Sequence, residues 1–162
     1  MLIAKKIMLY LHALKTNLIP LHKHIYYRED SPNIIVKEFK DLKKMDKEYL
    51  LHWKAQKLVS CPKIIEAVYE NQKGYLCMER MYGKTLDAYD EWDITSSMWA
   101  QIHQIVKTLY LHNIHYIAIQ PKNFILENGT NRIFVIDFGS AEQIKVNRFL
   151  NDFIDKEFRW NA

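Results

Sequence analysis

Asp137 is a residue whose type and place in the chain could hold a metal ion. Asp137 ends the apolar run of "IFVIDFGSAEQI", residues 133–144, and begins the triplet Asp-Phe-Gly. Asn123 lies fourteen residues upstream, in "QPKNFIL". Carboxylate and amide oxygens are ligands that Mg²⁺ accepts in proteins. A strand that ends in Asp and a turn glycine is also common, so the pattern leaves open whether Asp137 is a metal ligand or only a turn residue.

Lys37 and Glu48 are two further charged residues, and they precede this pair in the chain. Lys37 lies in "IIVKEF", residues 34–39, whose β-branched residues predict a strand. Glu48 lies in residues 41–59, which predict an amphipathic helix with Asp41 in its first turn. The helix is predicted from apolar residues that recur mostly every three or four positions: Leu42, Met45, Tyr49, Leu50, Trp53 and Leu58.

The segment after this helix predicts a β-hairpin. Residues 63–81 contain two apolar runs separated by Asn-Gln-Lys-Gly, and we expect Gly74 in the bend. The second run continues into "YLCMERMYGKTL", residues 75–86, where a strand leads to an acidic hinge and a glycine turn. The front part of the chain is therefore rich in strands.

The rear part predicts a helix followed by a second hairpin. Residues 95–113 form the helix, capped by Thr95 or Ser96, and residues 123–138 read as strand, Asn-Gly turn and strand. Helices are also expected over residues 3–16 and in "FLNDFIDKEF" near the end. The buried side of the 95–113 helix is expected to carry Met98, Ile102, Ile105, Leu109 and either Leu111 or His112.

The order of these features resembles the protein-kinase fold over about residues 34–142. That family places a lysine on a strand, a glutamate on a helix, an acidic hinge, Pro-x-Asn and then Asp-Phe-Gly. The resemblance implies an α+β, two-lobed and miniature kinase-like domain. Its N-lobe would be a small antiparallel sheet in residues 1–81 with the hinge at 79–82, and residues 82–162 would form a truncated helical C-lobe.

The resemblance also assigns roles to individual residues. Lys37 would meet the α- and β-phosphates of a nucleotide, and Glu48 would aim it. Asn123 and Asp137 would be the metal ligands. The back and the edge of the adenine site would be formed by Met78, Glu79 and Met81.

The catalytic loop departs from the family pattern. The family carries an Asp five residues before the metal-binding Asn and a Lys two residues after that Asp. These two positions hold Ala118 and Gln120 here, and Glu127 is the only acidic residue from 94 to 136. A methyl group cannot accept a proton, so we expect no catalytic residue at either position.

Two other departures concern glycine and length. A glycine-rich loop that covers the phosphates needs close approach of the backbone, and residues 1–33 contain no glycine. Only 23 residues follow Gly139, which leaves no room for the helices that bind a protein substrate in the family. No cofactor is therefore expected beyond weak binding of ATP and Mg²⁺.

These features predict a catalytically impaired protein that binds and regulates a partner, above all an active protein kinase. The alternative is an active, atypical phosphotransferase or ATPase that uses Lys37, Asn123 and Asp137. A third reading keeps nucleotide as a structural ligand without turnover. Aromatic residues near the C-terminus are candidate interface anchors, although they could equally close the core: Phe149, Phe153, Phe158 and Trp160.

Composition limits the function classes further. The 162 residues carry a net charge of +4, too small and scattered for nucleic-acid binding. Apolar residues make up 49%, but none of their runs is long enough to cross a membrane. With two cysteines in unrelated contexts, we expect an intracellular protein of the cytoplasm or nucleus. The small size and eroded motifs resemble viral kinase relatives, such as the kinase-interacting proteins of baculoviruses, which would place the protein in an infected cell.

Overall fold

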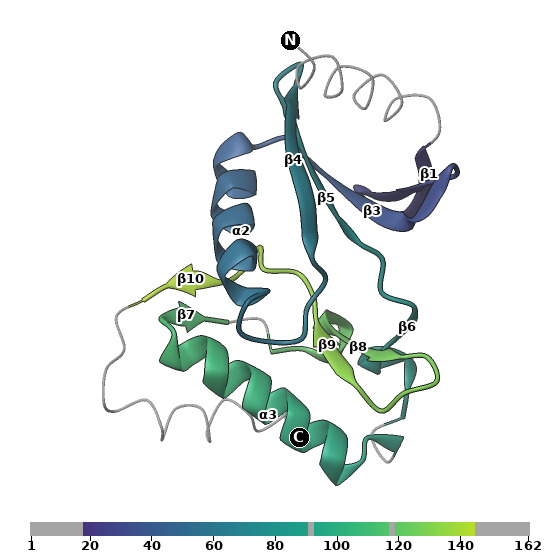
Figure 1. Cartoon of the computed structure of the whole chain (residues 1–162), viewed down its shortest axis with the longest axis vertical. Coiled ribbons are helices and arrows are strands. Elements are labelled where there is room, and N and C mark those ends of the chain that lie inside the picture. The colour runs from purple at the N-terminus through teal and green to yellow at the C-terminus, as the bar shows by residue number, and fades with distance from the viewer. Residues whose placement is uncertain (1–17, 91–92, 117–118, 145–162) are drawn as a thin grey trace. The chain divides into compact units, whose positions relative to one another are not determined.

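The structure is a computed structural model that describes residues 18–90, 93–116 and 119–144. The chain divides into two compact units. The first unit holds the described residues up to Tyr49 together with Lys63–Arg80, and the second holds Leu50–Pro62 together with the described residues from Met81 onward. Strands and helices both contribute, which confirms the α+β class (Figure 1).

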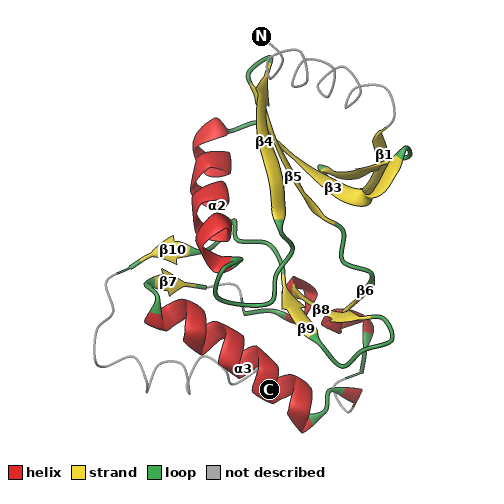
Figure 2. Ribbon diagram, in the orientation of Figure 1, coloured by secondary structure: helices red, strands yellow, loops and turns green. Residues whose placement is uncertain are grey.

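The first unit is built on a five-stranded antiparallel sheet in the order β1-β2-β3-β5-β4 (Figures 1 and 2). The predicted strand at 34–39 is confirmed within β3, and the predicted hairpin is confirmed as β4 and β5. The hairpin of β1 and β2 was not predicted. The strands are β1 (Leu18–His22), β2 (Ile25–Arg28), β3 (Ser31–Phe39), β4 (Ile64–Glu70) and β5 (Lys73–Glu79).

The turn of the β4–β5 hairpin differs from the prediction. Asn71 and Gln72 form the turn, both with positive φ, whereas Gly74 lies inside β5 opposite Phe39 of β3. Gly74 is needed for space, because a Cβ there would lie 2.2 Å from the sulfur of Met45. Asparagine tolerates the left-handed region better than most residues, so the turn forms without a glycine.

The predicted helix at 41–59 is confirmed as α2 (Leu42–Ala55). Asp41 precedes its first residue, and its side chain accepts hydrogen bonds from the N–H groups of Lys43 and Lys44. The buried side of α2 differs from the apolar pattern, because Leu50 and Trp53 are exposed while Glu48 and His52 are buried. Both buried polar side chains have hydrogen-bond partners, so their burial leaves neither polar group unpaired.

Within its described residues the second unit contains one long helix, α3 (Ser96–Leu111), as predicted, with Thr95 as its cap. Hairpin β8–β9 is also confirmed, and Gly129 lies in its turn with φ of 73°. The two strands of this hairpin are β8 (Phe124–Glu127) and β9 (Ile133–Val135). The other elements are short and were not predicted: β6 (Gly83–Thr85), η1 (Leu86–Ala88), β7 (Ile114–His115), η3 (Pro121–Asn123) and β10 (Glu142–Gln143).

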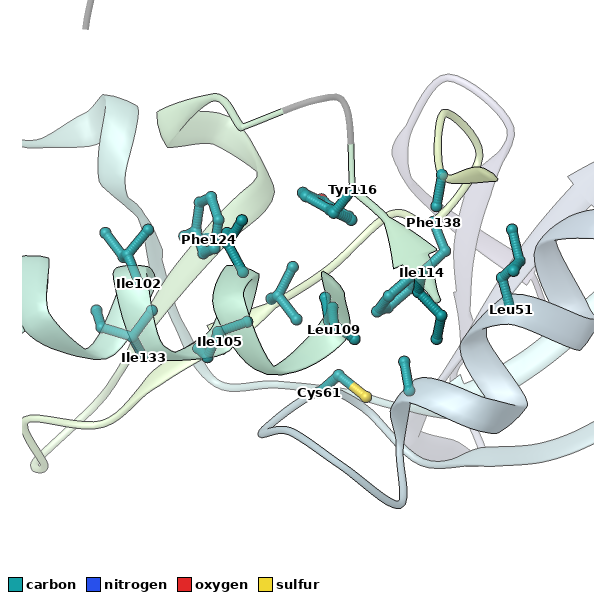
Figure 3. Close-up of a cluster of buried hydrophobic side chains, with 14 of the residues drawn as sticks. Leu51, Cys61, Ile102, Ile105, Leu109, Ile114, Tyr116, Phe124, Ile133 and Phe138 are labelled. Atoms are coloured by element: carbon teal, nitrogen blue, oxygen red, sulfur yellow. The ribbon is translucent and has the colours of Figure 1, made fainter. Parts of the chain in front are cut away.

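A single cluster of buried side chains forms the core of the second unit (Figure 3). Helix α3 supplies Ile102, Ile105 and Leu109, and β8 and β9 supply Phe124 and Ile133. The expectation for Leu111 or His112 was wrong, since both are exposed. Val106 and Tyr110 are buried in their place, because a period of 3.6 residues turns the end of the helix away from position 111.

The helices expected over 3–16 and 149–158 lie outside the described residues. Among the residues that the structure does describe, no helix is long and apolar enough to cross a membrane. Cys61 and Cys77 are both buried free thiols, and burial raises the pKa of Cys77 to about 12. A thiol with such a pKa stays neutral and unreactive at physiological pH.

The close contact at Gly74 leads to a stability prediction. Gly74→Ala should lower the free energy of unfolding by about 1–3 kcal/mol, because the added methyl meets the buried Met45. Urea unfolding measures the loss. Gly129→Asn is the control and should lower the urea midpoint less, since no atom lies near the added Cβ and asparagine tolerates positive φ better than most residues. An unchanged midpoint for Gly74→Ala would contradict the packing role.

Candidate functional site

Lys37 and Glu48 form an ion pair in the first unit. The ammonium of Lys37 lies 2.7 and 2.9 Å from the two carboxylate oxygens of Glu48. The Glu48 side chain is 3% exposed and that of Lys37 is 20% exposed. A carboxylate buried to this degree needs a cation close by, because water no longer solvates it. The structure therefore places in contact two residues that the sequence related only by their order along the chain.

The short interval between these residues is sufficient because of how α2 begins. Strand β3 ends at Phe39 and α2 begins at Leu42, so Glu48 lies in the second turn of the helix. Met45, three residues earlier on the same side, packs at Gly74 of β5. This contact turns the side of α2 that carries Glu48 towards the sheet. Eleven residues are therefore enough to connect the strand lysine to the helix glutamate.

The residues expected at the adenine site lie at the end of β5. Met78 is half-buried and pairs with Ile35, while Glu79 is exposed. The N–H groups of Glu79 and Arg80 donate to the carbonyl oxygens of Lys63 and Asn33, at 2.9 and 2.8 Å. These two backbone donors are therefore engaged within the first unit and are not available to a ligand.

Asn123 and Asp137 come together at one end of the β8–β9 hairpin in the second unit. Asn123 is buried and ends η3, directly before β8. The N–H of Ile136 donates to the carbonyl oxygen of Asn123 at 2.8 Å, so the residue before Asp137 is tied to Asn123. The pairing of Phe124 with Val135 continues this register. Residues fourteen positions apart thus become neighbours across a strand pair.

Asp137 adopts a strained backbone conformation. Its φ is 62°, in the left-handed region that few residues other than glycine enter. The N–H of Gly139 donates to its carboxylate at 3.1 Å. The hydroxyl of Tyr116 donates to the carbonyl oxygens of Ile136 and Asp137, at 2.6 and 3.1 Å. These bonds hold the turn, and the Asp137 side chain is exposed to solvent. Strain of this kind costs about 1–3 kcal/mol and often marks a functional site.

Phe138 anchors this turn in the core of the second unit. Its ring is fully buried, stacks on His52 at 4.7 Å between centroids, and meets the edge of Tyr116 at 5.5 Å. His52 Nε2 lies 2.7 Å from the carbonyl oxygen of Pro62, so this nitrogen must carry the hydrogen. Sequence reasoning missed both His52 and Tyr116, because neither belongs to an apolar pattern.

The positions that the sequence aligned with the catalytic Asp and Lys of the family are only partly described. Ala118 lies outside the described residues, and so do the interface candidates Phe149, Phe153, Phe158 and Trp160. Gln120 is exposed. Glu127 lies at the far end of β8 from Asn123, and its carboxylate accepts a hydrogen bond from Thr130. In the part of the chain that the structure describes, no three His, Cys, Asp or Glu side chains group as metal ligands.

The family model described as protein kinase domain matches residues 22–159. A search of the curated proteins found no match. The sequence motifs carried the resemblance over about residues 34–142, and the family match extends beyond this segment at both ends.

The burial of Glu48 leads to a prediction about the ion pair. Lys37→Met should lower the free energy of unfolding by about 3–5 kcal/mol, because it leaves a buried carboxylate without a cation. The double variant Lys37→Met/Glu48→Leu should recover most of this loss. Lys73→Met is the matched control, since Lys73 is 45% exposed and pairs with the less buried Glu38 on the same sheet, and it should lower the urea midpoint much less. Equal losses in the single and double variants would contradict a compensating role for Lys37.

Proposed function

The chain belongs to the protein kinase domain family, and from this premise we propose that it no longer transfers phosphate and acts by binding a protein partner. The partner is in the first place an active protein kinase, whose activity this chain regulates. The observation that carries the proposal is the absence of an acid at the catalytic position, where Ala118 stands. The proposed viral origin and intracellular site remain predictions.

The missing groups account for most of the chemistry that the family performs on the acceptor. The lost Asp would receive the proton of the substrate hydroxyl, and loss of a general base typically costs about 10²–10⁴ in rate. Gln120 also removes the cation that would face the γ-phosphate. Glu127 cannot replace the base from β8, since it lies three residues beyond the start of the strand and bonds Thr130 within the hairpin turn.

The phosphate cover is also reduced. Hairpin β1–β2 stands before the lysine-bearing strand, where the family carries its glycine-rich loop. Its turn is formed by Lys23 and His24, and His24 has φ of 60°. Side chains at a turn keep backbone N–H groups away from a phosphate, so this hairpin supports weak nucleotide binding at most.

A binding role is supported by apolar side chains exposed on α2. Leu50 and Trp53 lie three residues apart, on the same side of the helix, and are 51% and 40% exposed. The ammonium of Lys57 lies 4.9 Å from the centre of the Trp53 ring. Large aromatic and aliphatic residues next to a cation suit a partner surface with apolar and acidic side chains.

The second candidate function is phosphate transfer by an atypical mechanism. It is favoured by the Lys37–Glu48 ion pair and by the proximity of Asn123 to Asp137 in the second unit. If ATP is bound with Mg²⁺, the metal would supply charge neutralisation at the phosphates, and Asn123 and Asp137 have the oxygen donors that Mg²⁺ prefers. This function has less support than the first, because Glu127 is the only acidic residue between positions 94 and 136 and it bonds Thr130.

The two functions predict opposite results for the purified chain. Incubated with radiolabelled ATP, Mg²⁺ and a generic acceptor, the chain should give no label above background. Added to a kinase with which it co-purifies, it should change that kinase's rate by about fivefold or more. Asp137→Ala should leave this regulatory effect intact. Label incorporation that Asp137→Ala abolishes would establish the second candidate instead.

The exposed side of α2 should contribute to partner binding. Trp53→Ala should weaken the association with the regulated kinase by about tenfold or more, because it removes a large aromatic contact. Binding is measured by titration of the labelled kinase. Ile65→Ser is the matched control, since Ile65 is 49% exposed but lies on β4. A loss with the control and none with Trp53→Ala would place the contact on the sheet.

A further inference from the structure

One face of the five-stranded sheet carries Lys37 together with two rows of paired residues. Residues that lie opposite one another on antiparallel strands point to the same face, and so do residues two apart along a strand. Lys37 pairs with Ile25 on one side and Leu76 on the other. The neighbouring row is Tyr27, Ile35 and Met78. Tyr27 therefore shares a face with Lys37 and Met78, as the register of three strands requires.

Arg80 holds Tyr27 in place on this face. The centre of its guanidinium lies 4.5 Å from the centroid of the Tyr27 ring. Arg80 is itself fixed, because its N–H donates to the carbonyl oxygen of Asn33 at 2.8 Å and its Nη1 donates to that of Pro32 at 3.3 Å. Both Tyr27 and Arg80 are only partly exposed. The tyrosine ring is thus covered on one side by a cation anchored to the first residues of β3.

This arrangement bears on how a nucleotide base could lie against the sheet. With Met78 at its back and the hinge backbone at its edge, an adenine ring would lie flat on the row that contains Ile35 and Tyr27. A flat ring needs short side chains beneath it, because side chains on a sheet stand roughly perpendicular to its surface. Tyr27 is long, and the stacked Arg80 adds a second planar group over it.

We propose that Tyr27, held by Arg80, occupies the place of the adenine ring and excludes purine nucleotides from the chain. The inference rests on the proposed function, since the position of the base is taken from the kinase family. It goes further, because it assigns the exclusion to two residues outside the catalytic loop. Replacing Tyr27 with a short β-branched residue should then open the sheet face without disturbing β2.

Titration with a fluorescent ATP analogue and with adenosine tests the proposal, with Mg²⁺ present in every sample. The wild-type chain should show no saturable binding of either compound. Tyr27→Val should gain saturable binding of both, at least about tenfold tighter than any residual wild-type signal. Arg80→Ala, which frees the ring without shortening it, should give a smaller gain. Tyr69→Val is the control, since Tyr69 is exposed on β4, and it should gain nothing.

A third variant separates base binding from phosphate binding. Tyr27→Val/Lys37→Met/Glu48→Leu should lose affinity for the ATP analogue and keep its affinity for adenosine, because the lysine would meet only the phosphates. The Glu48→Leu change avoids leaving a buried carboxylate without its cation. Saturable binding by the wild-type chain, or no gain in both Tyr27→Val and Arg80→Ala, would overturn the proposal. Neither outcome depends on the effect of the chain on a partner kinase, so failure here and failure of the regulatory function are distinguishable.

Discussion

The burial of the Glu48 carboxylate is the constraint on which the first unit depends. A carboxylate with 3% of its side chain exposed is stable only with a cation at hydrogen-bond distance, and Lys37 supplies it. The pair and the packing of Met45 at Gly74 of β5 together fix which side of α2 faces the sheet, and a Cβ at position 74 would lie 2.2 Å from the Met45 sulfur. The same rotation leaves Leu50 and Trp53 in contact with solvent. The exposed apolar side of α2 is therefore a consequence of the ion pair.

In the second unit the geometry of the Asp-Phe-Gly turn depends on groups that take no part in phosphate transfer. Phe138 is held by His52 and Tyr116, and the hydroxyl of Tyr116 donates to the carbonyl oxygens of Ile136 and Asp137. The N–H of Ile136 donates to Asn123. Aromatic packing and backbone hydrogen bonds do not require a catalytic acid or base. The turn can therefore keep its shape in a chain that has Gln120 in place of the family's lysine.

Sequence periodicity predicted the long elements and missed what depends on distant contacts. Helices α2 and α3 and hairpins β4–β5 and β8–β9 were predicted because their patterns are local. Hairpin β1–β2 was missed because its turn, at Lys23 and His24, has no glycine. Gly74 was placed in a turn because glycine serves both turns and close contacts, and only the position of Met45 separates the two. The meeting of Lys37 and Glu48 could not be decided from an interval of eleven residues, since it depends on where α2 begins.

Retention of Lys37 does not by itself argue for turnover of ATP. Lys37 shares one face of the sheet with Tyr27, which Arg80 covers, and in our proposal these two residues take the place of the base. These features conflict if Lys37 serves a nucleotide. They are compatible if Lys37 serves Glu48, because the buried carboxylate requires the cation whether or not a nucleotide binds. The lysine that the family uses for catalysis is then required here by the electrostatics of the fold. Its presence indicates how α2 packs on the sheet and is not evidence for a reaction.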